Sequence, residues 1–134
     1  MAKSRILIVE DDPEIIQLYS LFLTRSGHEP IPALGGEEAL RILEEIEVDL
    51  IILDLMMPVM DGWTLLETIR QNERLRQVPV IIATVKHPLE NEGRIENYVD
   101  LFEGYLMKPF VGESLMKLID NTLRDPPSRS LPAE

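Results

Sequence analysis

Carboxylate, hydroxyl and ammonium side chains follow four apolar segments of the chain, each placed where its segment ends. In chain order these residues are Glu10, Asp11, Asp12, Asp54, Thr84 and Lys108. If the segments are parallel strands, their ends meet at one edge, where two carboxylates about 5 Å apart repel by about 3 kcal/mol at an effective dielectric near 20. Lys108 supplies one compensating charge. We therefore expect a hard divalent cation as well, and a small, partly hydrated oxygen site suits Mg²⁺.

This set of residues could carry out phosphoryl transfer. The Asp54 carboxylate is a candidate nucleophile toward phosphorus. Mg²⁺ and Lys108 would offset negative charge on the phosphoryl oxygens, and Thr84 would donate a hydrogen bond to them. Ordinary structural readings compete with this one, because Asp12 before Pro13 makes a good helix N-cap and Thr84 is a common strand residue. The residues alone leave both readings open, and capping by Asp12 is compatible with metal binding.

The elements that must position these residues alternate along the chain. Apolar runs predict strands at 6–9, 50–53, 78–84 and 105–107, with a further strand at 29–33. Helical spacing of apolar residues predicts helices at 13–26, 36–46, 63–71 and 112–123, and a more polar one at 89–99. This alternation predicts an α/β fold, a doubly wound five-stranded parallel sheet with helices on both faces. Ligands of such sheets bind beyond the carboxyl ends of the strands.

Two prolines indicate where one strand lies in this sheet. Pro30 and Pro32 are two residues apart, so both lack an N–H on the same side of the strand. Ile31, between them, can still pair with a neighbour on the other side. We therefore expect residues 29–33 to form an edge strand.

Composition limits the class of protein. The 134 residues include 24 Asp and Glu, 13 Lys and Arg and no Cys, for a formal net charge of −11. These values predict one soluble, cytoplasmic domain over residues 1–124, without disulfides, thiol chemistry or a cysteine zinc site. The acidic balance argues against direct nucleic-acid binding, and no apolar run has the length of a membrane span or a signal peptide. Residues 125–134 are expected to be a proline-rich flexible tail or linker stub.

Three segments resemble one known family. Residues 6–13 read Ile-Leu-Ile-Val-Glu-Asp-Asp-Pro, residues 53–62 read Leu-Asp-Leu-Met-Met-Pro-Val-Met-Asp-Gly, and residues 108–110 read Lys-Pro-Phe. In this order and on these elements they resemble receiver domains of bacterial two-component response regulators. The resemblance covers about residues 4–124 and implies a flavodoxin-like strand order of 2-1-3-4-5, which agrees with the proline-containing edge strand.

The resemblance also implies roles for individual residues. Asp54 would accept a phosphoryl group from a sensor histidine kinase or a phosphotransfer protein, and Lys108 would pair with the phosphate. The implied Mg²⁺ ligands are Asp11, Asp12, Asp54 and the backbone carbonyl of Met56. Thr84 and Tyr105 match the switch pair that remodels the face formed by the last strand and the helices on either side of it.

The implied partners are a phosphodonor and an output protein or a C-terminal effector domain. A phosphorylation-dependent dimer is also compatible with the resemblance. The domain would catalyse its own phosphotransfer and a slow autodephosphorylation, without being an enzyme toward other substrates.

This sequence departs from the family pattern at several places. Val85 replaces the usual alanine after the switch threonine and is expected to crowd the phosphoryl site. Leu101 and Phe102 replace a common Gly-Ala pair, which places a large ring near Tyr105. Met56 and Lys86 match positions that tune hydrolysis of the acyl phosphate, and an apolar Met56 predicts slow loss of phosphate.

Three other functions were compared with phosphoryl acceptance. A phosphatase using an aspartyl nucleophile would carry a second Asp two residues after it, where this chain has Met56. A flavodoxin-type electron carrier would need hydroxyl and N–H groups for a flavin phosphate in the first loop, which is acidic here. The remaining alternative is a receiver-like protein-interaction scaffold that is never phosphorylated. It would be expected to lack some of the acids or the lysine, and all are present.

Overall fold

The computed structural model describes residues 3–85, 97–108 and 112–127 of the chain. The strands are β1 (Arg5–Val9), β2 (Glu29–Ala33), β3 (Leu50–Leu53), β4 (Val80–Thr84) and β5 (Gly104–Met107). The helices are α1 (Pro13–Arg25), α2 (Gly36–Glu45), α3 (Gly62–Gln71), the short 3₁₀ helix η2 (Val99–Leu101) and α5 (Gly112–Arg124). The predicted helix at 89–99 lies mostly outside the described residues.

All five strands are parallel and follow the order β2-β1-β3-β4-β5. This confirms the predicted fold class and strand order. The prediction for the edge strand is also correct, because β1 is the one partner of β2 among the described strands. The Glu29 N–H donates to Ser4 O at 2.8 Å, so the N–H groups of alternate residues starting at Glu29 point toward β1. The backbone nitrogens of Pro30 and Pro32, which carry no hydrogen, therefore point to the outer side of β2, away from β1.

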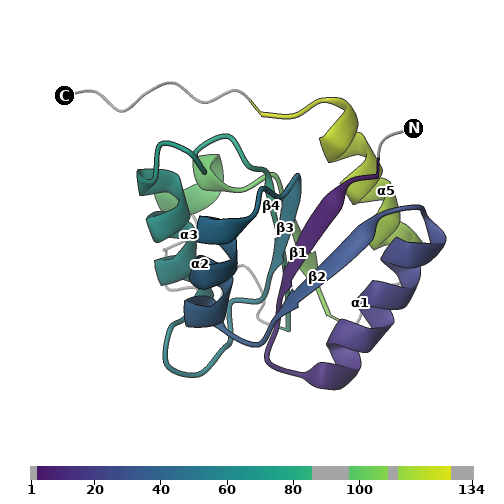
Figure 1. Cartoon of the computed structure of the whole chain (residues 1–134), viewed down its shortest axis with the longest axis horizontal. Helices are drawn as coiled ribbons and strands as arrows, with labels where there is room; N and C mark the ends of the chain where they lie inside the picture. The colour runs from purple at the N-terminus through teal and green to yellow at the C-terminus, as the bar shows by residue number, and fades with distance from the viewer. Residues whose placement is uncertain (1–2, 86–96, 109–111, 128–134) are drawn as a thin grey trace.

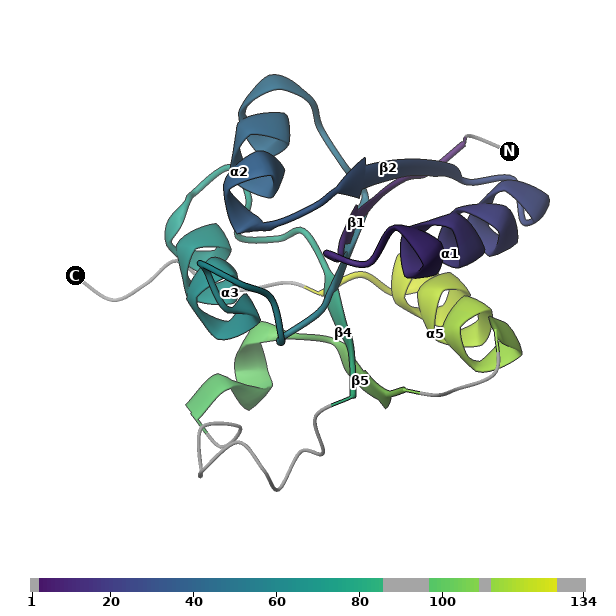
Figure 2. The same ribbon diagram turned by 90° about the horizontal axis from the view of Figure 1, so that it is seen from below.

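The sheet separates two apolar cores. Figures 1 and 2 show α2 and α3 on one face and α1 and α5 on the other. Leu7, Ile51 and Ile82 point toward α2 and α3, whereas Ile8, Ile52 and Ile81 point toward α1 and α5. This alternation explains why the three central strands are apolar throughout: both faces are covered.

Short polar signals set the starts of two helices. Asp12 caps α1, with its Oδ1 accepting from the Glu14 N–H at 3.0 Å and Pro13 at the first helical position. Asp61 caps α3 in the same way, accepting from the Thr64 N–H at 2.8 Å. Both caps lie at the carboxyl edge of the sheet, so they fix the loops that carry the candidate site. No helix among the described residues is long and apolar enough to cross a lipid bilayer.

Candidate functional site

Three carboxylates meet at the carboxyl edge of β1 and β3. Because Val9 is paired with Leu53, the residues that follow them, Glu10 and Asp54, lie side by side. The Asp54 N–H donates to Val9 O at 3.1 Å and fixes this arrangement. Glu10, Asp11 and Asp54 each offer an oxygen within 4.8 Å of the others, Glu10 and Asp54 being buried and Asp11 exposed.

Lys108 reaches this carboxylate group from the end of β5. Its Nζ lies 2.5 Å from Glu10 Oε1 and 3.5 Å from Asp54 Oδ2. Its backbone N–H donates to Thr84 O at 2.6 Å, which ties the end of β5 to the end of β4. The predicted meeting of Asp11, Asp54 and Lys108 at one edge is therefore seen in the structure, and one ammonium faces three carboxylates.

The electrostatic balance of the site is negative. Burial raises the pKa of Glu10 to about 7; the hydrogen bond from Lys108 opposes the rise and the nearby Asp54 carboxylate adds to it. Tyr19 of α1 is affected in the same direction, because burial raises the pKa of its hydroxyl and the charges of Glu10 and Asp54 raise it further. A group bringing positive charge to this edge would relieve the repulsion.

The donor set fits a hard divalent cation. Its three carboxylates are the oxygen ligands that Mg²⁺ prefers, and the exposed Asp11 leaves one side open to water, as Mg²⁺ requires. Among the described residues no histidine lies in this group. The fit is thus to Mg²⁺ and not to a nitrogen-preferring metal.

Asp12, which the resemblance implied as a metal ligand, is not part of this carboxylate group. Its side chain faces the first turn of α1, where it accepts the Glu14 N–H. Glu10 belongs to the group because it directly follows the last residue of β1 and so adjoins Asp54, and the ligand role of Asp12 stays a prediction. The sequence places Glu10 at this edge, as the residue after the first strand, but gives no sign that it is a ligand. The register of β1 against β3 is the signal that distinguishes the two acids.

The loop after β3 holds the Asp54 carboxylate in place. The Met56 N–H donates to Asp54 Oδ1 at 3.1 Å, while the Met56 side chain is about half exposed. Gly62, the first residue of α3, packs directly on this segment: a Cβ added to it would lie 2.6 Å from both Asp54 O and Leu55 Cα. Only glycine allows the start of α3 to approach the Asp54 backbone so closely.

The other predicted site residues lie along β4 and β5. Thr84 is fully buried at the end of β4, and Val85 beyond it is exposed. Tyr105 is half-buried on β5, opposite Ile82. Phe102 does lie near Tyr105, as expected, with ring centroids 6.0 Å apart. Lys86 and the Lys108–Pro109 peptide lie outside the described residues.

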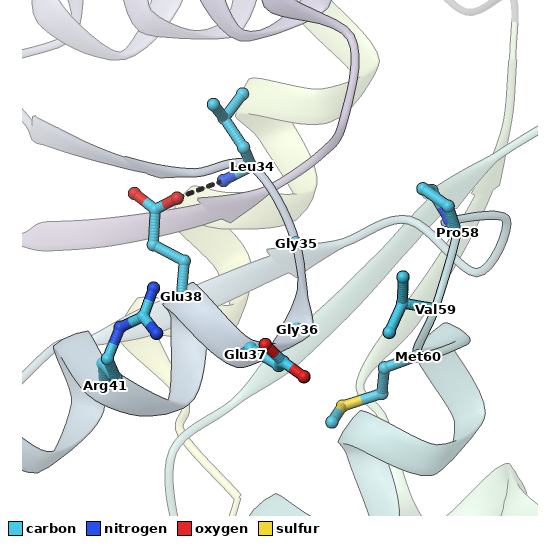
Figure 3. A pocket seen from close by; sticks show the side chains of 9 residues that line it. All are labelled: Leu34, Gly35, Gly36, Glu37, Glu38, Arg41, Pro58, Val59 and Met60. Carbon is cyan, nitrogen blue, oxygen red and sulfur yellow. Dashed lines mark hydrogen bonds between the residues drawn. The ribbon is translucent and has the colours of Figure 1, made fainter.

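A separate pocket lies between the β2–α2 and β3–α3 loops (Figure 3). It has a volume of about 260 Å³ and contains none of the carboxylates described above. Its lining residues are Leu34, Gly35, Gly36, Glu37, Glu38, Arg41, Pro58, Val59 and Met60. Glu38 Oε2 accepts the Leu34 N–H at 3.3 Å, so its acid is used to hold the loop. The candidate site is the carboxylate edge and not this pocket.

The fold and site together define an α/β protein of flavodoxin-like strand order with an acidic site at its topological switch point. Comparison with known proteins then gives the family. The model of the response regulator receiver domain matches residues 6–120, and the chain belongs to this family.

Individual relatives agree with this assignment. The chain is 33% identical over 120 residues to the DNA-binding dual master transcriptional regulator RpaA of Synechocystis, covering 90% of this chain and 49% of that protein. It is 32% identical over 124 residues to the transcriptional regulatory protein PrrA of Mycobacterium leprae, covering 92% and 52%. The chemotaxis protein CheY4 of Vibrio cholerae has a similar structure, with a TM-score of 0.81 at 30% identity, covering 90% and 98%. The chain thus spans about half the length of these curated relatives and nearly all of the CheY4 chain.

Proposed function

We propose that the protein is a phosphoryl-accepting signalling receiver in which Asp54 is the phosphoacceptor. The observation that carries the proposal is the buried Asp54 carboxylate, held by the Met56 N–H on Oδ1 and facing Lys108 Nζ on Oδ2 within a group of three acids. The donor would be the phosphohistidine of a sensor histidine kinase or a phosphotransfer protein. An Asp54 oxygen would form a bond to phosphorus while the phosphorus–nitrogen bond breaks and the imidazole leaves with the electron pair.

The residues around Asp54 support this reaction. Lys108 would place its ammonium against the phosphoryl oxygens, where it offsets the charge that accumulates during transfer. The carboxylates of Glu10, Asp11 and Asp54 and the backbone carbonyl of Met56 would hold Mg²⁺. The bound cation would supply positive charge to the same oxygens. Thr84 would donate its hydroxyl to the phosphoryl group, and Met56 and Lys86 would tune its hydrolysis.

Phosphorylation would act through a change of population between two conformations. Thr84 and Tyr105 would form the switch, with the output surface on the last strand and the helices on either side of it. The named relatives are transcriptional regulators about twice as long as this chain. By analogy, the receiver would control an effector domain or a separate output protein in the cytoplasm, and would itself make no nucleic-acid contact.

Intact-mass analysis after incubation with acetyl phosphate tests the proposal. We expect one added phosphoryl group on the wild-type chain in the presence of Mg²⁺ and none after Asp54→Asn or without Mg²⁺. Asp11→Asn should slow the modification at least tenfold, whereas Asp12→Asn, which alters only the helix cap, should leave it within about twofold.

Small donors react slowly with some receivers, so the histidine kinases of the source organism are the second donors in the same assay. Absence of an adduct from every donor would overturn the proposal and leave the scaffold as the better reading. An adduct that persists in Asp54→Asn would show that the acceptor has been misassigned.

A further inference from the structure

A group of aromatic rings connects the start of α3 with the segment before β5. Trp63 stacks on Tyr98 with ring centroids 4.8 Å apart and planes 20° apart. Trp63 also contacts Phe102 at 6.1 Å, and Phe102 contacts Tyr105 at 6.0 Å. Trp63 is 2% exposed, so its ring is enclosed by these neighbours. Residues 98–103, hereafter the 98–103 segment, lie beside α3 as Figure 2 shows.

The residue before Trp63 lies against the backbone of the phosphoacceptor Asp54. Gly62, immediately before Trp63, packs on Asp54 O and Leu55 Cα, and its N–H donates to Leu55 O at 3.1 Å. Lys108 lies three residues beyond Tyr105, and its Nζ is 3.5 Å from Asp54 Oδ2. A closed set of contacts therefore runs from Asp54 through Trp63 to Tyr105 and back through Lys108, whose backbone N–H also donates to Thr84 O.

The two ends of the 98–103 segment are attached to α3 with different strength. At its C-terminal end, buried Arg70 donates from Nε to Leu101 O at 2.9 Å and from Nη2 to Glu103 at 3.4 Å, and Glu103 also accepts the Val80 N–H at 2.7 Å. At its N-terminal end, the Tyr98 hydroxyl donates to the Glu67 carboxylate at the surface. An exposed side-chain bond is worth much less than a buried guanidinium with several acceptors. The Tyr98 end, held by its stack on Trp63 and this exposed bond, is therefore the end that detaches at lower cost while the Arg70 end stays fixed.

Resting on the function proposed above, we propose that attachment of Tyr98 to α3 is a regulatory contact that favours the unphosphorylated state. The structure shows the contact closed in the unmodified chain. Phosphorylation of Asp54 shifts the population toward a form in which Tyr98 has left Trp63 and Glu67. By thermodynamic reciprocity, any change that weakens the contact must favour the phosphorylated form by the same factor.

Beryllofluoride with Mg²⁺, a non-covalent phosphoryl analogue for aspartate, tests this proposal. Trp63 is the only tryptophan of the chain, so its emission reports the Tyr98 stack. The emission is titrated with beryllofluoride in the wild type, Tyr98→Phe, Glu67→Gln and the double variant. We expect each single change to raise the apparent affinity for beryllofluoride about three- to fivefold, which is the effect of losing one exposed charge-assisted hydrogen bond. The double variant should match Tyr98→Phe, because both changes remove the same contact.

The matched control is Val99→Ser, an exposed change in the same segment that leaves the Tyr98 hydroxyl, the Trp63 ring and the Glu67 carboxylate in place. It should leave the affinity within about 1.5-fold. Unchanged affinity in Tyr98→Phe and Glu67→Gln, or gains that add up in the double variant, would overturn the proposal while phosphorylation itself remained intact. Failure of the proposed function is recognised separately, because then beryllofluoride would give no Asp54-dependent response and no donor would add mass to the wild type.

Discussion

Two cationic side chains, buried Arg70 and partly buried Lys108, lie near opposite ends of β4, and their surroundings differ. Arg70 is 7% exposed and donates to the carbonyls of Leu75, Arg76, Val78 and Leu101 and to the Glu103 carboxylate. Lys108, at the other end, is one ammonium among three carboxylates. The Arg70 corner is balanced internally, whereas the Asp54 edge carries excess negative charge. Substitutions at the Arg70 corner should only remove stabilising contacts, whereas loss of a carboxylate at the Asp54 edge should relieve repulsion.

The largest expected effect is at the balanced corner. Arg70→Met would remove the guanidinium from four carbonyls and from the Glu103 carboxylate, which keeps only weaker support from the Val80 N–H, and this should lower the free energy of unfolding by about 3–5 kcal/mol. Urea denaturation followed by circular dichroism measures this change. Arg74→Met is the matched control, because exposed Arg74 donates to one carbonyl, Leu43 O, among the described residues, and its loss should cost less than about 1 kcal/mol. Similar losses for the two variants would contradict the comparison.

The two ends of β4 were not equally visible in the sequence. Asp54, Lys108 and the strand ends that bring them together could be predicted, because the carboxyl ends of parallel strands share an edge. The Arg70–Glu103 contact could not, since it joins residues 33 apart that belong to no apolar pattern. Its acceptors are mostly backbone carbonyls, which any sequence supplies. The packing of Trp63 on Tyr98 could not be predicted either, because the two residues are far apart in the sequence and share no pattern.

The choice among three consecutive acids shows a finer limit. Glu10, Asp11 and Asp12 are similar in sequence, and only the register of β1 on β3 and the start of α1 separate them. One clue to Asp12 was present, because an Asp before a proline is a good helix cap. Capping occupies one oxygen of Asp12, Oδ1, so the cap and a ligand role through the other oxygen stay compatible, and that role stays a prediction.

At the acidic edge, removal of one charge should stabilise the metal-free protein. At about pH 9, above the raised pKa of Glu10, Asp54→Asn removes the repulsion of two ionised carboxylates, about 3 kcal/mol each at an effective dielectric of 20, together with an attraction to Lys108 of about 5 kcal/mol. We expect the free energy of unfolding in EDTA to rise by about 1–2 kcal/mol. Urea denaturation at low ionic strength measures it. A loss of stability would mean that Lys108 already balances the site, and the two ends of β4 would then be alike.

Mg²⁺ should raise the free energy of unfolding through the Asp54 edge and not through the Arg70 corner. A cation that binds only the folded site at ten times its dissociation constant adds about 1.4 kcal/mol to the free energy of unfolding. The wild type should gain this stability as MgCl₂ replaces EDTA at constant ionic strength, and Asp54→Asn should gain almost none. Arg70→Met, if it remains folded, should keep the wild-type increment, because its site is untouched. An equal increment in Asp54→Asn would place the cation elsewhere.

The smallest expected effect concerns backbone strain beside the acidic edge. Val59, in the β3–α3 loop, has a φ of +70° and is 95% exposed, so its side chain gains almost no burial in return for a conformation that costs a β-branched residue about 1–2 kcal/mol. Val59→Gly removes that cost but increases the entropy of the unfolded chain, which leaves an expected net gain of about 0.5–1 kcal/mol. Val85→Gly is the matched control: Val85 is also exposed but has no positive φ, so the same substitution should destabilise by a similar amount. If both variants lose stability, the loop is not strained, and the excess energy at this end of the sheet is electrostatic alone.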